Sequence, residues 1–341
     1  MKKNFTENLN KIIKKNDLDQ ESMASMISDI FSGNITDAQI GAFMAALAVK
    51  GETFEELAGA AQAMRRKASR IQTLSKKIVD TCGTGGDSSN SFNISTTTAF
   101  AVAGCGVTVA KHGNRSITSK CGSADVLEYL GVNLDTDPEI VEEAVNDIGI
   151  GFLFAPKFHG AMKYAAKARK EVGIRSIFNM LGPLTNPAAA QYQLLGVFAP
   201  ELTEMFARAL KLLGTKRAFV VHGHDGMDEI TVCAGTRVSE LNNGMVKSYD
   251  IDPLDFFDEY AEPEELKGGD VKTNAKITES VLNGEKGARR NIVLLNTSVA
   301  LVAADAAETI AKGIKMAEES IDSGKAMAKL KELIEFTQEN G

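Results

Sequence analysis

A glycine-rich segment, Gly83–Thr84–Gly85–Gly86–Asp87, is the strongest local sign of chemistry in this 341-residue chain. Three glycines in four positions let backbone N–H groups approach an anion closely. The segment Asn93–Ile94–Ser95–Thr96 then opens a predicted helix, and the N-terminal ends of helices attract phosphate. The pattern predicts a phosphate-binding loop, with a plain strand-to-helix turn as the alternative. It is not a dinucleotide fingerprint, because Ser88 stands where the third glycine belongs.

Two further polar segments follow apolar runs that we expect to be strands. Lys111–His112–Gly113–Asn114–Arg115 comes directly after the run 107–110, and Asp228–Glu229 follows the run 218–223. Ligands of parallel sheets bind beyond the carboxyl ends of the strands, so these segments should converge with the glycine loop. Adjacent carboxylates facing phosphates suit Mg²⁺, which takes one or two carboxylates together with water and substrate oxygens. For the basic segment alone, a solvated loop is the alternative.

The elements that must position these segments fall into two parts. Apolar residues with helical spacing, and capping sequences that begin at Thr36 and Thr53, predict a helical domain over residues 1–72, which helices from about 157–187 rejoin. From residue 73 to 341, short apolar runs alternate with helical stretches, which is typical of a mostly parallel sheet flanked by helices. The predicted strands are 77–80, 107–110, 150–154, 218–223 and 292–295, with a surface excursion over 253–290. The predicted fold class is therefore α/β.

Composition narrows the classes of protein that remain. Apolar residues make up 44% and charged residues 24%, as in ordinary globular proteins. The net charge of −7 disfavours nucleic acid as a partner. The most apolar run, 99–110, is well short of the ~20 residues that span a membrane. Four cysteines without a Cys-x-x-Cys spacing fit a reducing cytoplasm.

The segments named above, together with Ala155–Pro156–Lys157–Phe158–His159 and Gly182–Pro183–Leu184–Thr185–Asn186–Pro187, resemble in order those of the anthranilate phosphoribosyltransferases. The resemblance runs through nearly the whole chain. It implies a nucleoside phosphorylase/phosphoribosyltransferase-like fold and transfer of the phosphoribosyl group of PRPP (5-phosphoribosyl-1-diphosphate) to the amine of anthranilate, with release of pyrophosphate, in tryptophan biosynthesis. It also implies Mg²⁺ as cofactor and a homodimer formed through the helical domain.

The same resemblance implies roles for individual residues. The expected PRPP contacts are Gly83, Gly86, Asp87, Ser88, Asn93, Ser95, Thr96, Lys111 and Ser123. The expected anthranilate contacts are Gly83, His112, Asn114, His159, Arg169 and Gly182. Ser95, Asp228 and Glu229 are the expected Mg²⁺-linked residues, and Lys111, Arg169, Asp228 and Glu229 the expected catalytic ones. One position departs from the family: Gly160 follows His159 where a proline is usual, which makes that helix start more flexible.

The implied chemistry fits these residue types. Breaking the C1–O bond of PRPP builds negative charge on the departing pyrophosphate, which backbone N–H groups, Lys111 and Mg²⁺ would stabilise. The amine of anthranilate is neutral at pH 7, so positioning is the main demand. We expect Arg169 to hold the anthranilate carboxylate by a forked, charge-assisted pair.

Two other functions stay open at this point. Pyrimidine nucleoside phosphorylases share the architecture and the glycine loop, but they bind a single phosphate and have a Lys-x-Ser-Gly-Arg turn; Asn114 after His112–Gly113 favours the anthranilate enzymes. A non-catalytic nucleic-acid-binding relative would need a basic groove, which the net charge and Asp228–Glu229 disfavour.

Overall fold

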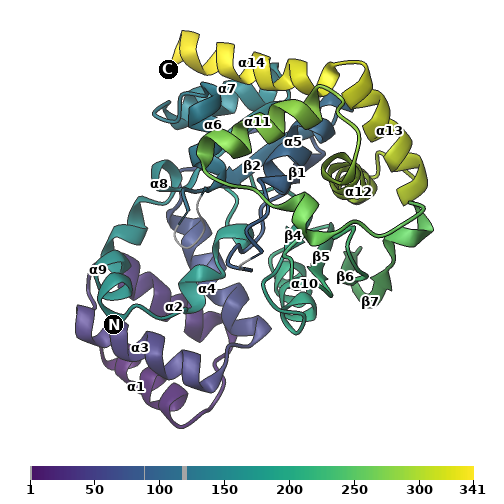
Figure 1. Ribbon diagram of the computed structural model, residues 1–341. Helices are drawn as coiled ribbons and strands as arrows, with labels where there is room; N and C mark the ends of the chain where they lie inside the picture. Colours follow the sequence, from purple (N-terminus) through teal and green to yellow (C-terminus); the bar gives the residue numbers. More distant parts are fainter. Residues whose placement is uncertain (1, 88, 117–120) are drawn as a thin grey trace.

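The computed structural model describes residues 2–87, 89–116 and 121–341. A helical bundle occupies one end of the molecule (Figure 1) and is made by α1 (Lys2–Ile13), α2 (Gln20–Phe31), α3 (Asp37–Lys50), α4 (Phe54–Lys67) and the later α9 (Lys163–Val172). The predicted capping boxes are confirmed: Thr36 pairs with Gln39 at the start of α3, and Thr53 pairs with Glu56 at the start of α4. Both helices therefore begin where the sequence places them.

The larger part of the chain forms a seven-stranded sheet in the order β3-β2-β1-β4-β5-β6-β7. The strands are β1 (Ile78–Asp80), β2 (Thr108–Gly113), β3 (Ile150–Phe154), β4 (Tyr192–Gly196), β5 (Arg217–Gly223), β6 (Thr236–Asn242) and β7 (Met245–Ile251). The first five are parallel to one another, β6 pairs antiparallel with β5, and β7 pairs antiparallel with β6. The chain moves outward from β1 to β3 and returns on the other side of β1 as β4. The strand order thus reverses between the neighbours β1 and β4. Open α/β sheets bind ligands at such a switch point, beyond the carboxyl ends of the strands.

Buried apolar clusters lie on both faces of the sheet, because successive side chains of a strand point to opposite faces. On β4 and β5, Leu194, Phe219 and Val221 join the core of the larger domain. Leu195, Ala218 and Val220 join the core of the bundle instead. The bundle thus packs on one face of the sheet with α10 (Leu202–Leu212), which contacts α4 and β5.

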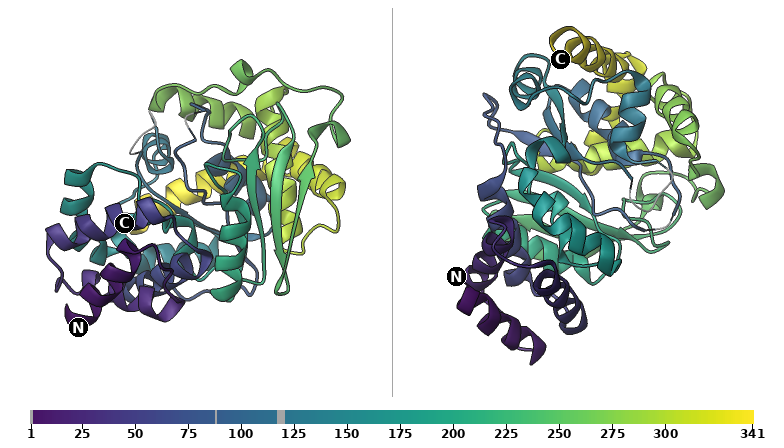
Figure 2. Two further views of the ribbon diagram at one scale, coloured as in Figure 1. Left: turned by 90° about the horizontal axis from the view of Figure 1, so that it is seen from below. Right: turned by 90° about the vertical axis from the view of Figure 1, so that its left-hand side faces the viewer.

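The other face is covered by helices from both halves of the larger domain. They are α5 (Ile94–Gly104), α6 (Ser123–Leu130), α11 (Val271–Leu282), α12 (Ala288–Ala303), α13 (Ile310–Asp322) and α14 (Lys325–Asn340). Helix α7 (Pro138–Asp147) packs beside β3 at the edge of the sheet, where its Val141 and Val145 cluster with Leu153. The two views of Figure 2 show the same arrangement, with the N-terminal helices at one end of the molecule and the sheet between them and most of these helices. The predicted α/β class with a mainly N-terminal helical domain is confirmed.

Several predicted elements are wrong in detail. The predicted strand 292–295 lies inside α12, where all four residues are buried. A short apolar run does not distinguish a buried strand from a helix that is buried all round. The excursion 253–290 contains α11, and most of the helix predicted over 176–181 is a single 3₁₀ turn, Ile177–Asn179. Strands β4, β6 and β7 were not predicted.

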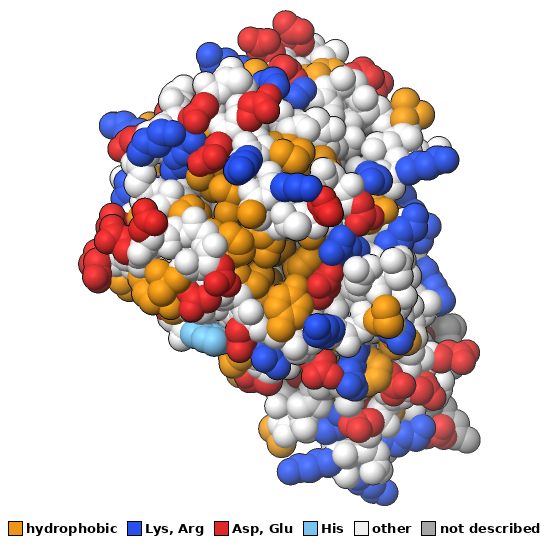
Figure 3. All heavy atoms as spheres, turned by 90° about the vertical axis from the view of Figure 1, so that its right-hand side faces the viewer, with side chains coloured by type: hydrophobic (Ala, Val, Ile, Leu, Met, Phe, Trp, Pro, Cys, Tyr) orange, Lys and Arg blue, Asp and Glu red, His pale blue; other side chains and the backbone are white. Residues whose placement is uncertain are grey.

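One face of the molecule carries apolar side chains in a hollow ringed by charges of both signs (Figure 3). It is the side on which β7 and α13 lie, and these elements hold half-buried residues such as Tyr249 and Ile314 that pack against the main core. Among the described residues, no helix has both the length and the apolar composition needed to cross a membrane.

Candidate functional site

Asp80, at the end of β1, is a fully buried carboxylate that joins three segments of the chain. It accepts hydrogen bonds from the backbone N–H groups of Cys82 and His112, both at 3.1 Å, and from Nδ2 of Asn186 at 2.7 Å. Burial raises the pKa of Asp80 to about 6, although these donors and nearby Lys111 favour its charged form. The carboxylate therefore fixes β1, β2 and the turn 182–187 relative to one another.

The glycine loop after β1 is held against the end of β4 and the Asp228–Glu229 segment. The N–H of Thr84 donates to the Gly196 carbonyl at 2.8 Å, and the N–H of Gly85 donates to Oδ2 of Asp228 at 2.8 Å. Gly85 and Gly86 have φ values of +65° and +82°, which favour glycine. A Cβ on Gly83 would lie 3.0 Å from the Gly196 carbonyl. The glycines thus allow the loop to pack closely against β4 and Asp228, and binding of an anion by the loop stays a prediction.

Lys111 is buried at the end of β2 and points toward the start of α5. Its Nζ lies 3.3 Å from Oγ1 of Thr81 and 3.4 Å from Oγ of Ser95. In the described part of the chain it has no ion pair with a carboxylate. Because β2 extends to Gly113, Lys111, His112 and Gly113 belong to the strand itself, not to a turn beyond it as predicted. Lys111 consequently offers a buried ammonium to a ligand at the strand ends.

Three carboxylates crowd the same place. The N–H of Asp228 donates to Oδ2 of Asp87 at 3.3 Å, and Oε1 of Glu229 accepts from the N–H of Ser95 at 3.1 Å. Burial and then the charge of Asp87 raise the pKa of Asp228 to about 7. Burial and then the charge of Asp228 raise the pKa of Glu229 well above its usual value. The crowding disfavours the charged forms, so a cation between these groups would be stabilising.

Asn296, on α12, holds the acidic segment in place. Its Oδ1 accepts from the N–H of Ile230 at 3.1 Å, and its Nδ2 donates to the carbonyls of Ile230 and Ile292, both at 2.8 Å. The side chain is fully buried, so an apolar replacement would leave the Ile230 backbone without partners. Sequence reasoning missed Asn296 and Asn186; an amide inside a long apolar run was the signal for Asn296.

We call the group of Gly83, Gly85, Asp87, Ser95, Lys111, Asp228 and Glu229 the strand-end cluster, since the contacts above connect all of its members. The remaining predicted PRPP contacts lie in the segments beside it. Asn93 Oδ1 accepts from Asn274 at 3.0 Å, Thr96 is buried, and Ser123 Oγ donates to the Asn114 carbonyl at 3.2 Å. Ser88 lies outside the described residues.

Two histidines form a second group next to Gly182. The rings of His112 and His159 meet edge to face with their centroids 5.1 Å apart. Nδ1 of His112 lies 2.9 Å from the Gly182 carbonyl, which only accepts, so Nδ1 carries the proton and Nε2 is an acceptor. Burial lowers the pKa of His112 to about 4, and burial together with His112 lowers that of His159 to about 3. Both rings are therefore neutral at pH 7.

The other predicted anthranilate contacts are more loosely held. Arg169, on α9, is half-buried, and its guanidinium carbon lies 5.7 Å from the centroid of the Phe178 ring. Its guanidinium has no hydrogen bond or ion pair with any of the described residues, and burial lowers its pKa. Asn114 is exposed. Gly160 begins a short 3₁₀ turn, and the space around the position of its Cβ is open. The glycine that stands here in place of the usual proline therefore does not crowd His159.

Comparisons with known proteins agree with this geometry. Residues 75–327 match the α/β domain, and residues 6–68 the helical bundle domain, of a glycosyl transferase family. The anthranilate phosphoribosyltransferase of Desulfosudis oleivorans is 68% identical over 99% of this chain and 100% of its own length. The chain belongs to the anthranilate phosphoribosyltransferase family. As a member of that family it is an enzyme.

Solved structures of anthranilate phosphoribosyltransferases have the same fold. The enzyme of Thermus thermophilus is 39% identical, with a TM-score of 0.92 over 97% of this chain and 99% of the other. The enzyme of Saccharomyces cerevisiae in complex with PRPP and Mg is 29% identical, with a TM-score of 0.87 over 97% and 98%. The likeness spans both the helical bundle and the sheet.

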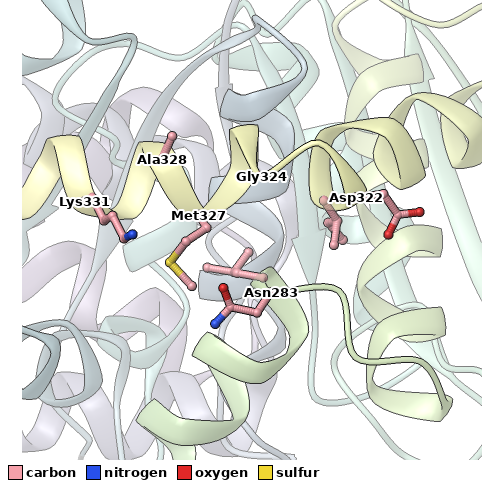
Figure 4. A pocket seen from close by; sticks show the side chains of 8 residues that line it. Asn283, Asp322, Gly324, Met327, Ala328 and Lys331 are labelled. Atoms are coloured by element: carbon pink, nitrogen blue, oxygen red, sulfur yellow. The ribbon is translucent and has the colours of Figure 1, made fainter.

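A pocket elsewhere on the molecule shares no residue with the strand-end cluster. It lies between the end of α11, the end of α13 and the first half of α14, and Figure 4 shows Asp322 and Lys331 on its rim. Asp322 is already bound by the buried Arg290, with oxygen-to-nitrogen distances of 2.5 and 2.9 Å. The pocket therefore offers few unsatisfied polar groups.

The buried histidine pair predicts how stability depends on pH. The unfolded chain binds a proton at each histidine below its ordinary pKa of 6.5, whereas folded His159 does so only near 3. Its contribution to stability is thus complete above pH 6.5 and is lost as the pH falls, by about 1.4 kcal/mol per pH unit. His159→Phe, which keeps a ring, should make the loss of unfolding free energy between pH 6 and 4.5 shallower by roughly that slope.

Urea unfolding of both proteins across this pH range measures the difference. The raised pKa values of Asp80, Asp228 and Glu229 change the unfolding free energy in the opposite direction as the pH falls. Both proteins share this contribution, so it cancels when one stability curve is subtracted from the other. Above pH 7 the two stability curves should run parallel. Equal slopes below pH 6 would show that folded His159 takes up a proton as readily as the unfolded chain.

Proposed function

We propose that the strand-end cluster is where the chain transfers the 5-phosphoribosyl group of PRPP to the amine of anthranilate. The products are N-(5-phosphoribosyl)anthranilate and pyrophosphate, and the reaction is a step of tryptophan biosynthesis. The single observation that carries this proposal is the convergence of a glycine loop, a buried lysine and paired carboxylates at the β1/β4 switch point. A phosphorylase that binds a single phosphate has no need for such a carboxylate pair.

In this proposal PRPP lies along the glycine loop and the start of α5. The residues that contact it are Gly83, Gly86, Asp87, Ser88, Asn93, Ser95, Thr96, Lys111 and Ser123. Support comes from the positive end of α5, where the N–H of Ser95 already donates to Glu229, and from the Lys111 ammonium, which lacks a carboxylate partner in the described chain. The same two features would stabilise the negative charge that develops on the departing pyrophosphate.

Asp228, Glu229 and the Ser95 hydroxyl would hold Mg²⁺ in this proposal. Hard oxygen ligands fit this ion, and a cation would offset the burial and the repulsion that raise the pKa values of Asp228 and Glu229. Within the described residues, no three His, Cys, Asp or Glu side chains are arranged to bind a metal by themselves, so substrate oxygens would complete the coordination. When bound, Mg²⁺ supplies positive charge beside the phosphate oxygens.

Anthranilate lies on the other side of the cluster in this proposal, near Gly83, His112, Asn114, His159, Arg169 and Gly182. The neutral histidine rings would form an aromatic wall, because neither is charged at pH 7. Arg169 is a suitable partner for the anthranilate carboxylate, since its guanidinium has no other anion among the described residues. The chain would thus accelerate the reaction mainly by positioning a neutral amine next to C1 of PRPP.

The metal assignment predicts a specific loss in the Asp228→Asn/Glu229→Gln double variant. The native enzyme should lower anthranilate fluorescence only when both PRPP and Mg²⁺ are present. The variant should need about tenfold more Mg²⁺ for half-maximal rate, because each lost carboxylate removes a charged ligand. The control is Asp258→Asn/Glu259→Gln, an exposed Asp-Glu pair with the same change in charge. An unaltered Mg²⁺ titration would contradict the assignment.

The anthranilate assignment is tested with Arg169→Ala. Loss of the forked pair should raise the anthranilate KM by at least about tenfold, with a much smaller change in the PRPP KM. Lys170→Ala removes an exposed charge from the next position of the same helix and should leave both constants unchanged. An anthranilate KM equal to that of the native enzyme would show that Arg169 does not bind the anthranilate carboxylate.

We also propose that the enzyme is a cytoplasmic homodimer that pairs through a helical domain of residues 1–72, the remainder 73–341 being the α/β domain. The apolar side chains Ala38, Ala42, Ala45 and Val49 follow one another at helical spacing on the exposed side of α3. A helix that is apolar on every side normally lies in an interior, which supports a partner there. Cys82, Cys105 and Cys233 carry free thiols, which supports a reducing compartment.

The dimer proposal predicts that Val49→Asp weakens self-association. Val49 is 74% exposed in the single chain, and a carboxylate there would have to be buried without a partner in the dimer. Sedimentation should show the native protein as a dimer and the variant with a dissociation constant raised by about tenfold or more. Leu74→Asp, at an equally exposed apolar residue outside the bundle helices, is the control. A native monomer would refute the proposal.

A further inference from the structure

A second arginine, Arg175, reaches the glycine loop from the segment that also carries Arg169. It follows α9 after Gly173, whose φ of +66° turns the chain out of the helix. Its Nη2 donates to the Gly86 carbonyl at 3.0 Å, and its guanidinium carbon lies 3.9 Å from the centroid of the Phe198 ring. The side chain is thus fixed at two points, although the residue as a whole is exposed.

We propose that Arg175 is a positioning residue for PRPP, which sets the orientation of the Gly86 peptide in the glycine loop. In a trans peptide the C=O and the following N–H point in opposite directions. Since the Gly86 carbonyl faces Arg175, the N–H of Asp87 is directed away from the guanidinium. The arginine thereby fixes the direction of a backbone donor in the loop assigned to PRPP, and this inference rests on the proposed function.

Arg175 completes a set of three anchors on consecutive residues of the loop. Thr84 is held by the Gly196 carbonyl at 2.8 Å, and Gly85 by Asp228 at 2.8 Å. The N–H of Phe198 donates to Oγ1 of Thr84 at 3.2 Å. Phe198 therefore supports the loop directly and also provides the ring on which Arg175 stacks. Without Arg175, Gly86 would have no anchor from outside the loop among the contacts of the described chain.

The close approach of Arg175 depends on the glycine at position 86. A Cβ on Gly86 would lie 2.7 Å from Nη2 of Arg175, and the φ of +82° already favours glycine. The stacking geometry also requires a planar cation, because a guanidinium packs flat on an aromatic ring whereas an ammonium does not. The contact therefore distinguishes arginine from lysine, which provides a test that separates geometry from charge.

The test compares Arg175→Ala, Arg175→Lys and Phe198→Leu in steady-state assays of anthranilate consumption. Arg175→Ala should raise the PRPP KM by about tenfold and leave the anthranilate KM within about twofold. Arg175→Lys should restore only a small part of the loss, and Phe198→Leu should raise the PRPP KM in the same direction. The double variant should be no worse than Arg175→Ala, because both changes remove one coupled contact. Lys170→Ala is the charge control.

The possible failures are distinguishable. A native protein that consumes no anthranilate with PRPP and Mg²⁺ would refute the proposed function. An unchanged PRPP KM in Arg175→Ala would overturn only the role of Arg175. Full rescue by lysine, with no effect of Phe198→Leu, would overturn it in favour of charge alone. Thermal-shift titration with PRPP and Mg²⁺ reports binding without turnover: equal stabilisation of the native protein and Arg175→Ala overturns the inference, and a smaller shift in the variant supports it.

Discussion

The buried carboxylate of Asp80 is the interaction on which the arrangement of the site depends. A carboxylate without water is stable only when its oxygens are hydrogen-bonded, and three donors from three segments meet at this one. One donor is the backbone of β2, so the ends of β1 and β2 are fixed side by side. Another is Asn186, whose turn also carries Gly182, the partner of His112. The carboxylate therefore connects the start of the glycine loop with the strand and the turn that carry the His112–Gly182 contact.

The charges around the glycine loop are unbalanced in a way that suits a ligand carrying both signs. Lys111 has no carboxylate partner in the described chain, while burial and then a neighbouring carboxylate raise the pKa values of Asp228 and Glu229. A magnesium–phosphate pair would satisfy both sides, because the metal meets the carboxylates and the phosphate oxygens meet the ammonium. Under the proposed function, such a ligand would complete the arrangement of charges that the protein already holds in place, which is a form of preorganisation.

The sequence predicted those parts of the site that are local in the chain. The glycine loop, Lys111 and the Asp228–Glu229 pair each follow a short apolar run, and parallel strands bring such segments together. The roles of Arg169, Asn114 and Ser123 came only from the family resemblance. Arg175 was assigned no role, because its contact with Gly86 joins residues 89 positions apart. No local pattern records such a contact.

Errors in the fold have similar physical reasons. The hairpin of β6 and β7 was missed although Asn243–Gly244 stands between its strands, with φ values of +48° and +80°. Asn-Gly is a strong hairpin signal, so this error was avoidable. The wrong assignment of 292–295 as a strand was harder to avoid. Nearly all of α12 is buried, so the apolar run shows no exposed polar face that would reveal the helical period.

The segment 163–187 connects the helical bundle with the glycine loop and the ends of β1 and β2. Ala165 and Ala168 on α9 belong to the bundle core, and Arg65 on α4 donates to the Leu184 carbonyl at 2.6 Å. The same segment sends Arg175 to the glycine loop, Gly182 to His112 and Asn186 to Asp80. One short segment is packed in the bundle and hydrogen-bonded to the strand ends. A movement of the bundle would therefore shift residues on both sides of the candidate site. The helical bundle is therefore coupled to the loop after β1, because Arg175 and Asn186 of this segment bond to the loop and to Asp80.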